Sequence, residues 1–235
     1  MKLVLLPGMD GTGELFSEFI AALPEPFEAV AVSYPTERYL PYSELENFVR
    51  AACPLSEPYM LVAESFSTPL AIQYAATNPA NLEGLVLCAG FATSPVKGWR
   101  RFLGSLLAPL VFCIPLPNLA AKLWLVGADA PTSLLTAVRH AISSVQPGVL
   151  AGRLRAVLAS DVRGAVGRIG VPILYIRAEQ DRLVSGLCVE ELRQIRPEMS
   201  VAVLAGPHLL LQRWPQRAAE AVVRFIRSCR PSGVA

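Results

Sequence analysis

The stretch that decides the fold is residues 59–76, YMLVAESFSTPLAIQYAA. It predicts a buried strand over 59–62, a sharp turn over 63–67 and a helix over 68–76. Ser65 lies at the centre of the turn, with a small residue two positions before it and another two positions after it. This pattern is typical of a nucleophile elbow, in which a serine occupies a strained backbone and bulky neighbours would clash. Its usual form is G-x-S-x-G, and the form here, A-x-S-x-S, needs support from elsewhere in the chain.

Two polar residues further along the chain supply that support. Asp181 lies in the loop after the apolar run 171–176, and His208 lies in the loop after the run 201–204. Each follows the carboxyl end of a predicted strand, where catalytic groups gather in open α/β sheets. The chain order serine, acid, histidine is that of the α/β-hydrolase triad and differs from the chymotrypsin and subtilisin orders. Over nearly its whole length the chain therefore resembles the α/β-hydrolase superfamily.

The resemblance implies a catalytic triad of Ser65, Asp181 and His208. Glu179 is the alternative acid, but the family spacing, with a small residue three positions before the acid and an apolar residue three positions after it, selects Asp181. His140, the other histidine, precedes the acid and lies in a predicted helix, where we expect a surface or packing role. The alternative for Ser65 is an inert buried serine at a strand-to-helix turn.

A glycine-rich loop over 7–13 follows the first predicted strand, 2–6. By the same resemblance, this loop and the elbow supply an oxyanion hole from two backbone amides, those of Met9 and Phe66. The family commonly has a histidine before the glycine of this loop, whereas this chain has Pro7. What braces the loop is therefore left open by the sequence.

Four polar residues beside the proposed site are expected to have structural roles. Asp10 is expected to cap the turn 11–14 and Glu64 to face solvent, although either carboxylate would tune the local potential if it lay close to the triad. Thr12 and Ser67 are expected to serve as small structural residues.

Six apolar runs predict six strands, at residues 2–6, 29–33, 59–63, 84–89, 171–176 and 200–204. Helical patterns separate most of them, as parallel α/β units require. Because the oxyanion loop begins at residue 7, the family's antiparallel first hairpin has no room. We therefore expect the α/β-hydrolase fold, α/β in class, with a mostly parallel six-stranded sheet in the order 2-1-3-4-5-6, flanked by helices. A chain of 235 residues suits a single domain, residues 1–235.

About eighty residues separate the fourth predicted strand from the fifth, too many for a plain loop. Helical periodicity over 99–107, 118–126, 133–143 and 147–158 predicts a helical insertion, and the resemblance implies a cap over the active site at residues 91–168. Its apolar side is expected to face substrate, the alternative being that most of these side chains pack the cap against the core. The pocket candidates are Trp99, Phe102, Leu106, Phe112, Leu123, Trp124 and Leu135.

The insertion also carries the charge asymmetry of the chain. Residues 91–170 hold nine basic and two acidic residues, a net charge of +7, in a chain whose net charge is +2. This segment suits an anionic partner such as an acyl carrier protein or an anionic lipid surface, with Arg139, Arg153 and Arg155 as the proposed contacts. The alternative is ordinary solvated arginines on helix faces. Since no nucleic-acid-binding motif is present, we expect no nucleic-acid partner.

Composition limits the cellular setting. The most apolar stretch, 106–126, contains three prolines and Lys122, so no stable membrane insertion is expected. The apolar run at the start stops at residue 7, so we expect no signal peptide there. Five cysteines lack metal or redox spacing and are interpreted as buried or incidental thiols of a cytoplasmic protein. They are Cys53, Cys88, Cys113, Cys188 and Cys229.

Together with the resemblance, these residues predict a serine carboxylesterase that hydrolyses small to medium acyl esters through an acyl-enzyme and needs no metal or organic cofactor. In size, insertion position and basic insertion the chain is similar to the compact esterases that cleave the methyl ester of pimeloyl-carrier protein. The alternatives are an esterase or thioesterase acting on such carrier-linked acyl groups, with an acyl carrier protein as partner, and a ligand-binding homologue whose triad is silent. The carboxylesterase prediction requires no partner other than a small-molecule ester as substrate.

Overall fold

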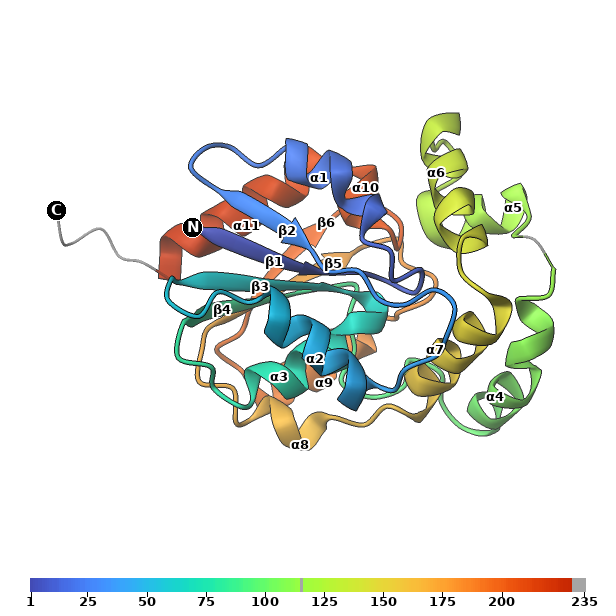
Figure 1. The fold of residues 1–235 in the computed structure, drawn as a ribbon, viewed down its shortest axis with the longest axis horizontal. Coiled ribbons are helices and arrows are strands. Elements are labelled where there is room, and N and C mark those ends of the chain that lie inside the picture. The colour runs from blue at the N-terminus through green and yellow to red at the C-terminus, as the bar shows by residue number, and fades with distance from the viewer. Residues whose placement is uncertain (115, 230–235) are drawn as a thin grey trace, which may run out of the picture.

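The computed structural model describes residues 1–114 and 116–229, in which six strands form one sheet (Figure 1). Their order is β2-β1-β3-β4-β5-β6, as predicted, and every neighbouring pair is parallel. The fifth strand begins later than predicted, because Pro172 has no N–H to donate to the ladder. The strands are β1 (Lys2–Leu6), β2 (Glu28–Ala31), β3 (Tyr59–Glu64), β4 (Leu82–Cys88), β5 (Ile173–Ala178) and β6 (Ser200–Leu204).

Alternate strand residues divide the core into two layers, one on each face of the sheet. In β1, Val4 and Leu6 belong to one apolar cluster, and Leu3 and Leu5 belong to the other. This period of two is what a sheet with helices on both faces requires. One layer contains α2 (Tyr42–Ala52), α3 (Thr68–Ala75), α8 (Arg163–Val166) and α9 (Leu187–Ile195), and the other contains the 3₁₀ turn Glu14–Phe16, α1 (Ser17–Ala21), α10 (Leu210–Arg213) and α11 (Pro215–Cys229).

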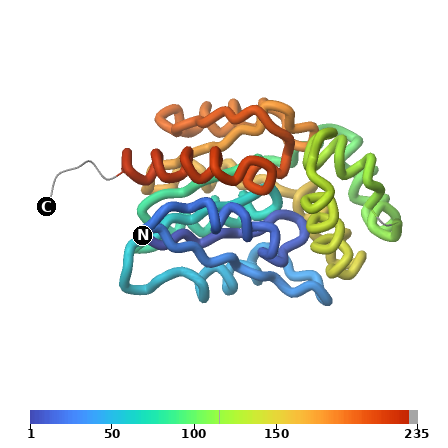
Figure 2. The backbone as a smooth tube through the Cα atoms, turned by 90° about the horizontal axis from the view of Figure 1, so that it is seen from above, coloured from blue at the N-terminus to red at the C-terminus, as the bar shows by residue number. Residues whose placement is uncertain are grey.

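The segment between β4 and β5 is helical, as predicted. Helices α4 to α7 gather at the end of the sheet to which the strand arrowheads point (Figure 1), and in Figure 2 they form a group at one end of the molecule. Helix α8 packs against α3 and α9. The predicted helix over 118–126 is divided, because its second half is a π-helical turn, Lys122–Val126. The helices at this end are α4 (Trp99–Val111), α5 (Asn118–Ala121), α6 (Thr132–Ser143) and α7 (Pro147–Ala159).

The packing of the helices described above does not test the predicted boundaries of the single domain or of the cap. The single domain over 1–235 includes residues 115 and 230–235, which lie outside the described part of the chain. The cap over 91–168 likewise stays a prediction. Across residues 1–114 and 116–229, we find no helix with the length and apolarity needed to cross a membrane.

Candidate active site

Three side chains that are far apart in sequence meet beyond the carboxyl ends of β3, β5 and β6. His208 Nε2 lies 2.8 Å from Ser65 Oγ, and His208 Nδ1 lies 2.7 Å from Asp181 Oδ2. Because a carboxylate only accepts hydrogen bonds, this geometry places the ring proton on Nδ1 and leaves Nε2 to accept the serine hydroxyl. The side chains of His208 and Asp181 are 5% and 3% exposed, so little water competes for these contacts. The structure therefore brings together the three residues predicted as a triad.

The turn that carries Ser65 has the strained backbone of a nucleophile elbow. Its φ is +46°, in the left-handed region that residues other than glycine rarely adopt. The small residues two positions to either side are completely buried, so longer side chains would not fit there. Two hydrogen bonds hold the turn: Thr68 Oγ1 donates to the carbonyl of Ser65, and the Tyr42 hydroxyl donates to the carbonyl of Phe66, each at 2.7 Å. This turn includes the 3₁₀ segment Ser65–Ser67.

The acid is oriented by the backbone of its own loop. Asp181 Oδ1 accepts hydrogen bonds from the amides of residues 183–184 at 2.8 and 2.9 Å, which leaves Oδ2 directed at His208. Charge-assisted bonds of this kind fix the plane of a carboxylate. The two alternatives from the sequence, Glu179 and His140, are both exposed.

The glycine-rich loop after β1 lies beside the elbow because β1 and β3 are neighbours in the sheet. Ser67 ties the two together: its hydroxyl donates to the carbonyl of Pro7 and lies 2.9 Å from the Tyr34 hydroxyl. A hydroxyl two positions after Ser65 thus braces the loop in which the family usually has a histidine. The amide of Met9 belongs to the glycine-rich loop and the amide of Phe66 belongs to the elbow, so both lie in these two adjoining segments. Their role as oxyanion donors stays a prediction.

Arg153 is a second brace on the same loop, and the prediction that it contacts an anionic partner is wrong. It is 2% exposed. From α7, its Nη1 donates to the carbonyls of Met9 at 3.0 Å and Asp10 at 2.6 Å, and its Nη2 donates to the carbonyl of Pro35 at 2.9 Å. Burial lowers the pKa of the Arg153 guanidinium, and Asp10 and Tyr34 oppose that shift. Helical spacing in the sequence gave no sign that this side chain reaches a loop near the amino terminus.

Removing this brace is expected to cost stability. Arg153→Met leaves three carbonyls without their buried donor, so we expect the free energy of unfolding to fall by roughly 3 kcal/mol. Arg155→Met is the matched control on the same helix: Arg155 is exposed, and its Nε donates to the carbonyl of Ser105 at 3.2 Å. The control should lose less than about 1 kcal/mol in urea unfolding. Equal losses in the two variants would contradict the bracing role of Arg153.

The carboxylates of Asp10 and Glu64, which lie beside the site, differ in their hydrogen bonding. Asp10 caps its turn as predicted, because its Oδ2 accepts from Thr12 N at 2.9 Å and from Thr12 Oγ1 at 2.7 Å. Glu64, predicted to face solvent, is 1% exposed, because it is the last residue of β3 and points into the sheet's buried face. Gln212 Nε2 donates to Glu64 Oε2 at 3.1 Å, and within the described residues Oε1 has no partner. Burial raises the pKa of Glu64 to about 7, opposed by the charge of His208 and the Gln212 bond.

Glu64 is expected to make the stability of the protein pH-dependent. Its pKa is about 7 in the folded protein against the ordinary value of 4.5 for a glutamate, so the folded protein keeps a proton that the unfolded chain releases. The contribution of Glu64 is therefore fully present below about pH 4.5 and is lost as the pH rises through 7, by roughly 3 kcal/mol in total. Glu64→Gln cannot ionise, so its free energy of unfolding should fall less than that of the wild type between about pH 5 and about pH 8.5.

The matched control for this titration is Glu179→Gln, which removes an exposed carboxylate near the same end of the sheet. Denaturant unfolding across the pH series should give the control the wild-type pH dependence. If Glu64→Gln also follows the wild-type curve, Glu64 does not hold the proton assigned to it.

The seven predicted pocket residues divide into packed and exposed groups. Leu135 is buried in a cluster that includes Leu209, the neighbour of His208, so packing, the alternative interpretation, holds for Leu135. Phe112 packs against a cluster that also contacts Met9. Substrate contact by any of the seven stays a prediction. The remaining five are half-exposed or strongly exposed: Trp99, Phe102, Leu106, Leu123 and Trp124.

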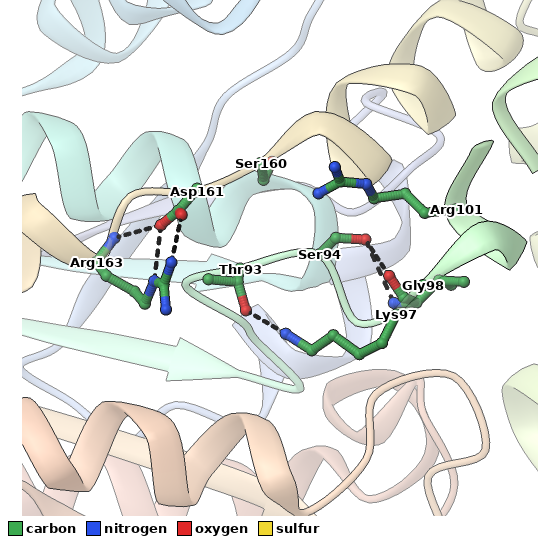
Figure 3. Close-up of a pocket in the computed structure, with 9 residues that line it drawn as sticks. Thr93, Ser94, Lys97, Gly98, Arg101, Ser160, Asp161 and Arg163 are labelled. Carbon is green, nitrogen blue, oxygen red and sulfur yellow. Dashed lines mark hydrogen bonds and ion pairs between the residues drawn. The ribbon is translucent and has the colours of Figure 1, made fainter.

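A cavity of about 460 Å³ lies where the segment after β4 meets the end of α7 (Figure 3). Its lining is polar: Lys97 Nζ donates to Thr93 Oγ1 at 2.6 Å, and Arg163 donates to both oxygens of Asp161 at 2.9 and 2.6 Å. Neither the triad nor any of the seven pocket candidates lines it. This cavity is therefore distinct from the predicted substrate pocket.

Comparison with solved structures identifies the fold. A bromoperoxidase from Bacillus anthracis is similar with a TM-score of 0.80 and 17% identity, over 96% of this chain and 91% of that one. An enol-lactonase from Burkholderia xenovorans has a TM-score of 0.77 and 17% identity, over 96% and 90%. A carboxylesterase from Nitrososphaera gargenis has a TM-score of 0.77 and 16% identity, over 97% and 90%. No protein-family model and no curated protein matched the sequence.

The sheet order and these similarities establish that the chain has the α/β-hydrolase fold. Its structural neighbours include hydrolases, carboxylesterases and a lactonase. At such low identities the likeness defines the fold alone, and one fold supports many reactions. The reaction therefore depends on the residues of the site.

Proposed function

We propose that the protein is a serine carboxylesterase that hydrolyses small to medium acyl esters through an acyl-enzyme intermediate. The observation that carries this proposal is the continuous line of short contacts from Asp181 through His208 to Ser65 Oγ. A serine hydroxyl is a weak nucleophile until an adjacent base takes its proton, and this arrangement supplies that base. The resemblance to carboxylesterase and lactonase structures supports an ester as the substrate.

In the proposed reaction, Ser65 Oγ attacks the ester carbonyl while His208 Nε2 takes the hydroxyl proton. Asp181 keeps the ring proton on Nδ1 and stabilises the imidazolium that forms. The amides of Met9 and Phe66 bind the negative oxygen of the tetrahedral intermediate, each contributing about 3 kcal/mol. His208 returns the proton to the leaving alcohol, and a water molecule then repeats the sequence on the acyl-enzyme. These steps require neither a metal nor an organic cofactor.

Carrier-linked acyl groups are the alternative substrates, with an acyl carrier protein as the partner. Of the three arginines assigned to such a contact, Arg139 and Arg155 are exposed, whereas the buried Arg153 is not available. The cytoplasmic location also stays a prediction.

A panel of p-nitrophenyl esters from acetyl to dodecanoyl, with a matched acyl thioester, tests the proposed function. We expect kcat/KM to be highest for a short or medium acyl chain and lower for the dodecanoyl ester and the thioester. Faster turnover of the thioester would favour the thioesterase alternative. A folded wild-type protein that hydrolyses no member of the panel would contradict the proposal and favour a silent triad.

A further inference from the structure

Helix α4 turns its large apolar side chains away from the rest of the protein. Six of them recur at the three- and four-residue spacing of a single helix face, and we call this set the outward stripe. Phe102 is 77% exposed, and Leu106 and Leu110 are each 64% exposed. The outward stripe consists of Trp99, Phe102, Leu103, Leu106, Leu107 and Leu110.

The opposite face of α4 makes the contacts that hold the helix to the protein. This face is built from small residues and packs on α7. Ala108 is completely buried, and a Cβ added to Gly104 would lie 3.2 Å from Leu158. The usual arrangement of an amphipathic surface helix is therefore reversed, since the bulky apolar side faces water. Apolar surface of this extent marks a site of interaction with a protein, a ligand or a membrane.

The charges around α4 indicate what covers the outward stripe. Residues 84–128 contain no Asp or Glu, whereas Lys97, Arg100 and Arg101 lie at the start of α4 and Lys122 lies beyond its end. Arg100 and Arg101 are exposed, and within residues 1–114 and 116–229 neither is paired with a carboxylate. An apolar helix face whose own flanking segments carry cations and no carboxylate is complementary to a surface that is apolar inside and anionic at its boundary.

We propose that the outward stripe docks on the surface of an anionic lipid bilayer. The stripe enters the boundary between headgroups and acyl chains, while Arg100 and Arg101 contact acidic headgroups. Trp99, at the first position of α4, suits the interfacial depth at which tryptophan is enriched. With 13 residues, α4 is too short to cross the bilayer and lies along its surface. A second copy of the chain is a poorer occupant, because its own residues 84–128 carry the same cations and no carboxylate to pair with them.

The docking face and the triad lie at the same end of the molecule. Helix α4 belongs to the group of helices at the carboxyl ends of the strands (Figure 1), and Ser65 follows the carboxyl end of β3. Docking therefore holds the triad end of the sheet near the bilayer. The lipid interaction itself does not depend on hydrolysis, so it is tested without turnover.

Flotation of the full-length protein with vesicles tests the docking surface. We expect the wild type to float with an equal mixture of phosphatidylcholine and phosphatidylglycerol, to float much less with phosphatidylcholine alone, and to dissociate as salt is added. The double variant Phe102→Asp and Leu106→Asp should bind the mixed vesicles more than about tenfold less. The double variant Arg100→Gln and Arg101→Gln should bind them roughly tenfold less.

Leu55→Asp is the matched control, because Leu55 is 92% exposed and precedes the amino end of β3, whereas α4 lies at the carboxyl ends of the strands. This control should float like the wild type, and all variants should keep the wild-type unfolding midpoint. Turnover of a water-soluble ester should be unchanged in the control and in the Arg100→Gln and Arg101→Gln double variant. Three results would overturn the docking proposal: no flotation of the wild type, equal binding to both vesicles, or undiminished binding of the stripe variant. A dimer that the stripe variant converts to monomer, with no vesicle binding, would assign the face to a second copy instead.

Discussion

Ser65→Ala is expected to lower kcat for every hydrolysable ester by about 10⁵-fold or more, while KM changes little. The loss is large because the hydroxyl forms the covalent bond to the acyl group, and neither His208 nor the oxyanion donors can replace it. Activity measured with the best p-nitrophenyl ester of the panel gives the comparison. The fold should survive, because Ser65 is only partly buried and its side-chain contact is with His208 Nε2.

The control for this variant is Ser67→Ala, two residues away. Ser67 is completely buried and its hydroxyl braces the glycine-rich loop, so its loss should lower kcat by about tenfold at most. If Ser65→Ala kept more activity than Ser67→Ala, the nucleophile would be another residue.

Asp181→Asn is expected to reduce kcat by about 10⁴-fold with little change in structure. The asparagine amide can donate to His208 Nδ1, and this stabilises the ring tautomer that carries its proton on Nε2. That tautomer cannot accept the Ser65 proton, and the variant also loses the negative charge that stabilises the imidazolium. The measurement is the kcat of the variant across the pH range in which the wild type is active.

Glu179→Gln is the matched control for the acid, because Glu179 is the alternative acid that the sequence offers and its side chain is exposed. It should keep kcat within about twofold of the wild type. A greater loss in Glu179→Gln than in Asp181→Asn would show that the acid had been assigned to the wrong carboxylate.

The sheet and the meeting of three distant residues were predictable because they depend on patterns that sequence records directly. Apolar runs separated by helical patterns predicted six strands, and the resemblance to α/β-hydrolases implied their order, which the structure confirms. Once those strands are parallel, Ser65, Asp181 and His208 follow the same edge, and their convergence is a consequence of topology. The first and last residues of each strand were less predictable, because a strand begins where the neighbouring strand offers hydrogen-bond partners to its backbone.

The supports of the site were not predictable, because they depend on which buried groups meet across the fold. Arg153 looks in sequence like one more basic residue of the insertion, yet it binds three carbonyls of two distant loops. Glu64 looks like a solvent-facing residue of the elbow, yet the pleat of β3 carries it into the core beside Gln212. The sequence offered one signal, which is position. Residue 64 directly follows an apolar run typical of a strand buried on both faces, so its side chain would be buried whichever face it takes.

The outward stripe shows a different limit. Trp99, Phe102 and Leu106 were predicted to line a substrate pocket because the apolar side of a cap helix is expected to face substrate, and that contact stays a prediction. Large apolar residues on one helix face are also normally the buried ones. In the structure, the small residues of α4 permit close packing on α7, so the large ones are left exposed. Periodicity defines the two faces of a helix, whereas the packing partner decides which face is buried.

The measurement that tests the proposed mechanism most directly is the mass of the intact protein after reaction with a fluorophosphonate, followed by peptide mapping. We predict one adduct on Ser65 in the wild type, none in Ser65→Ala, and strongly slowed labelling in His208→Ala, because the reagent reports a serine activated by its base. A folded wild-type protein that remains unlabelled, or an adduct on any other residue, would contradict the assignment of Ser65 as the nucleophile.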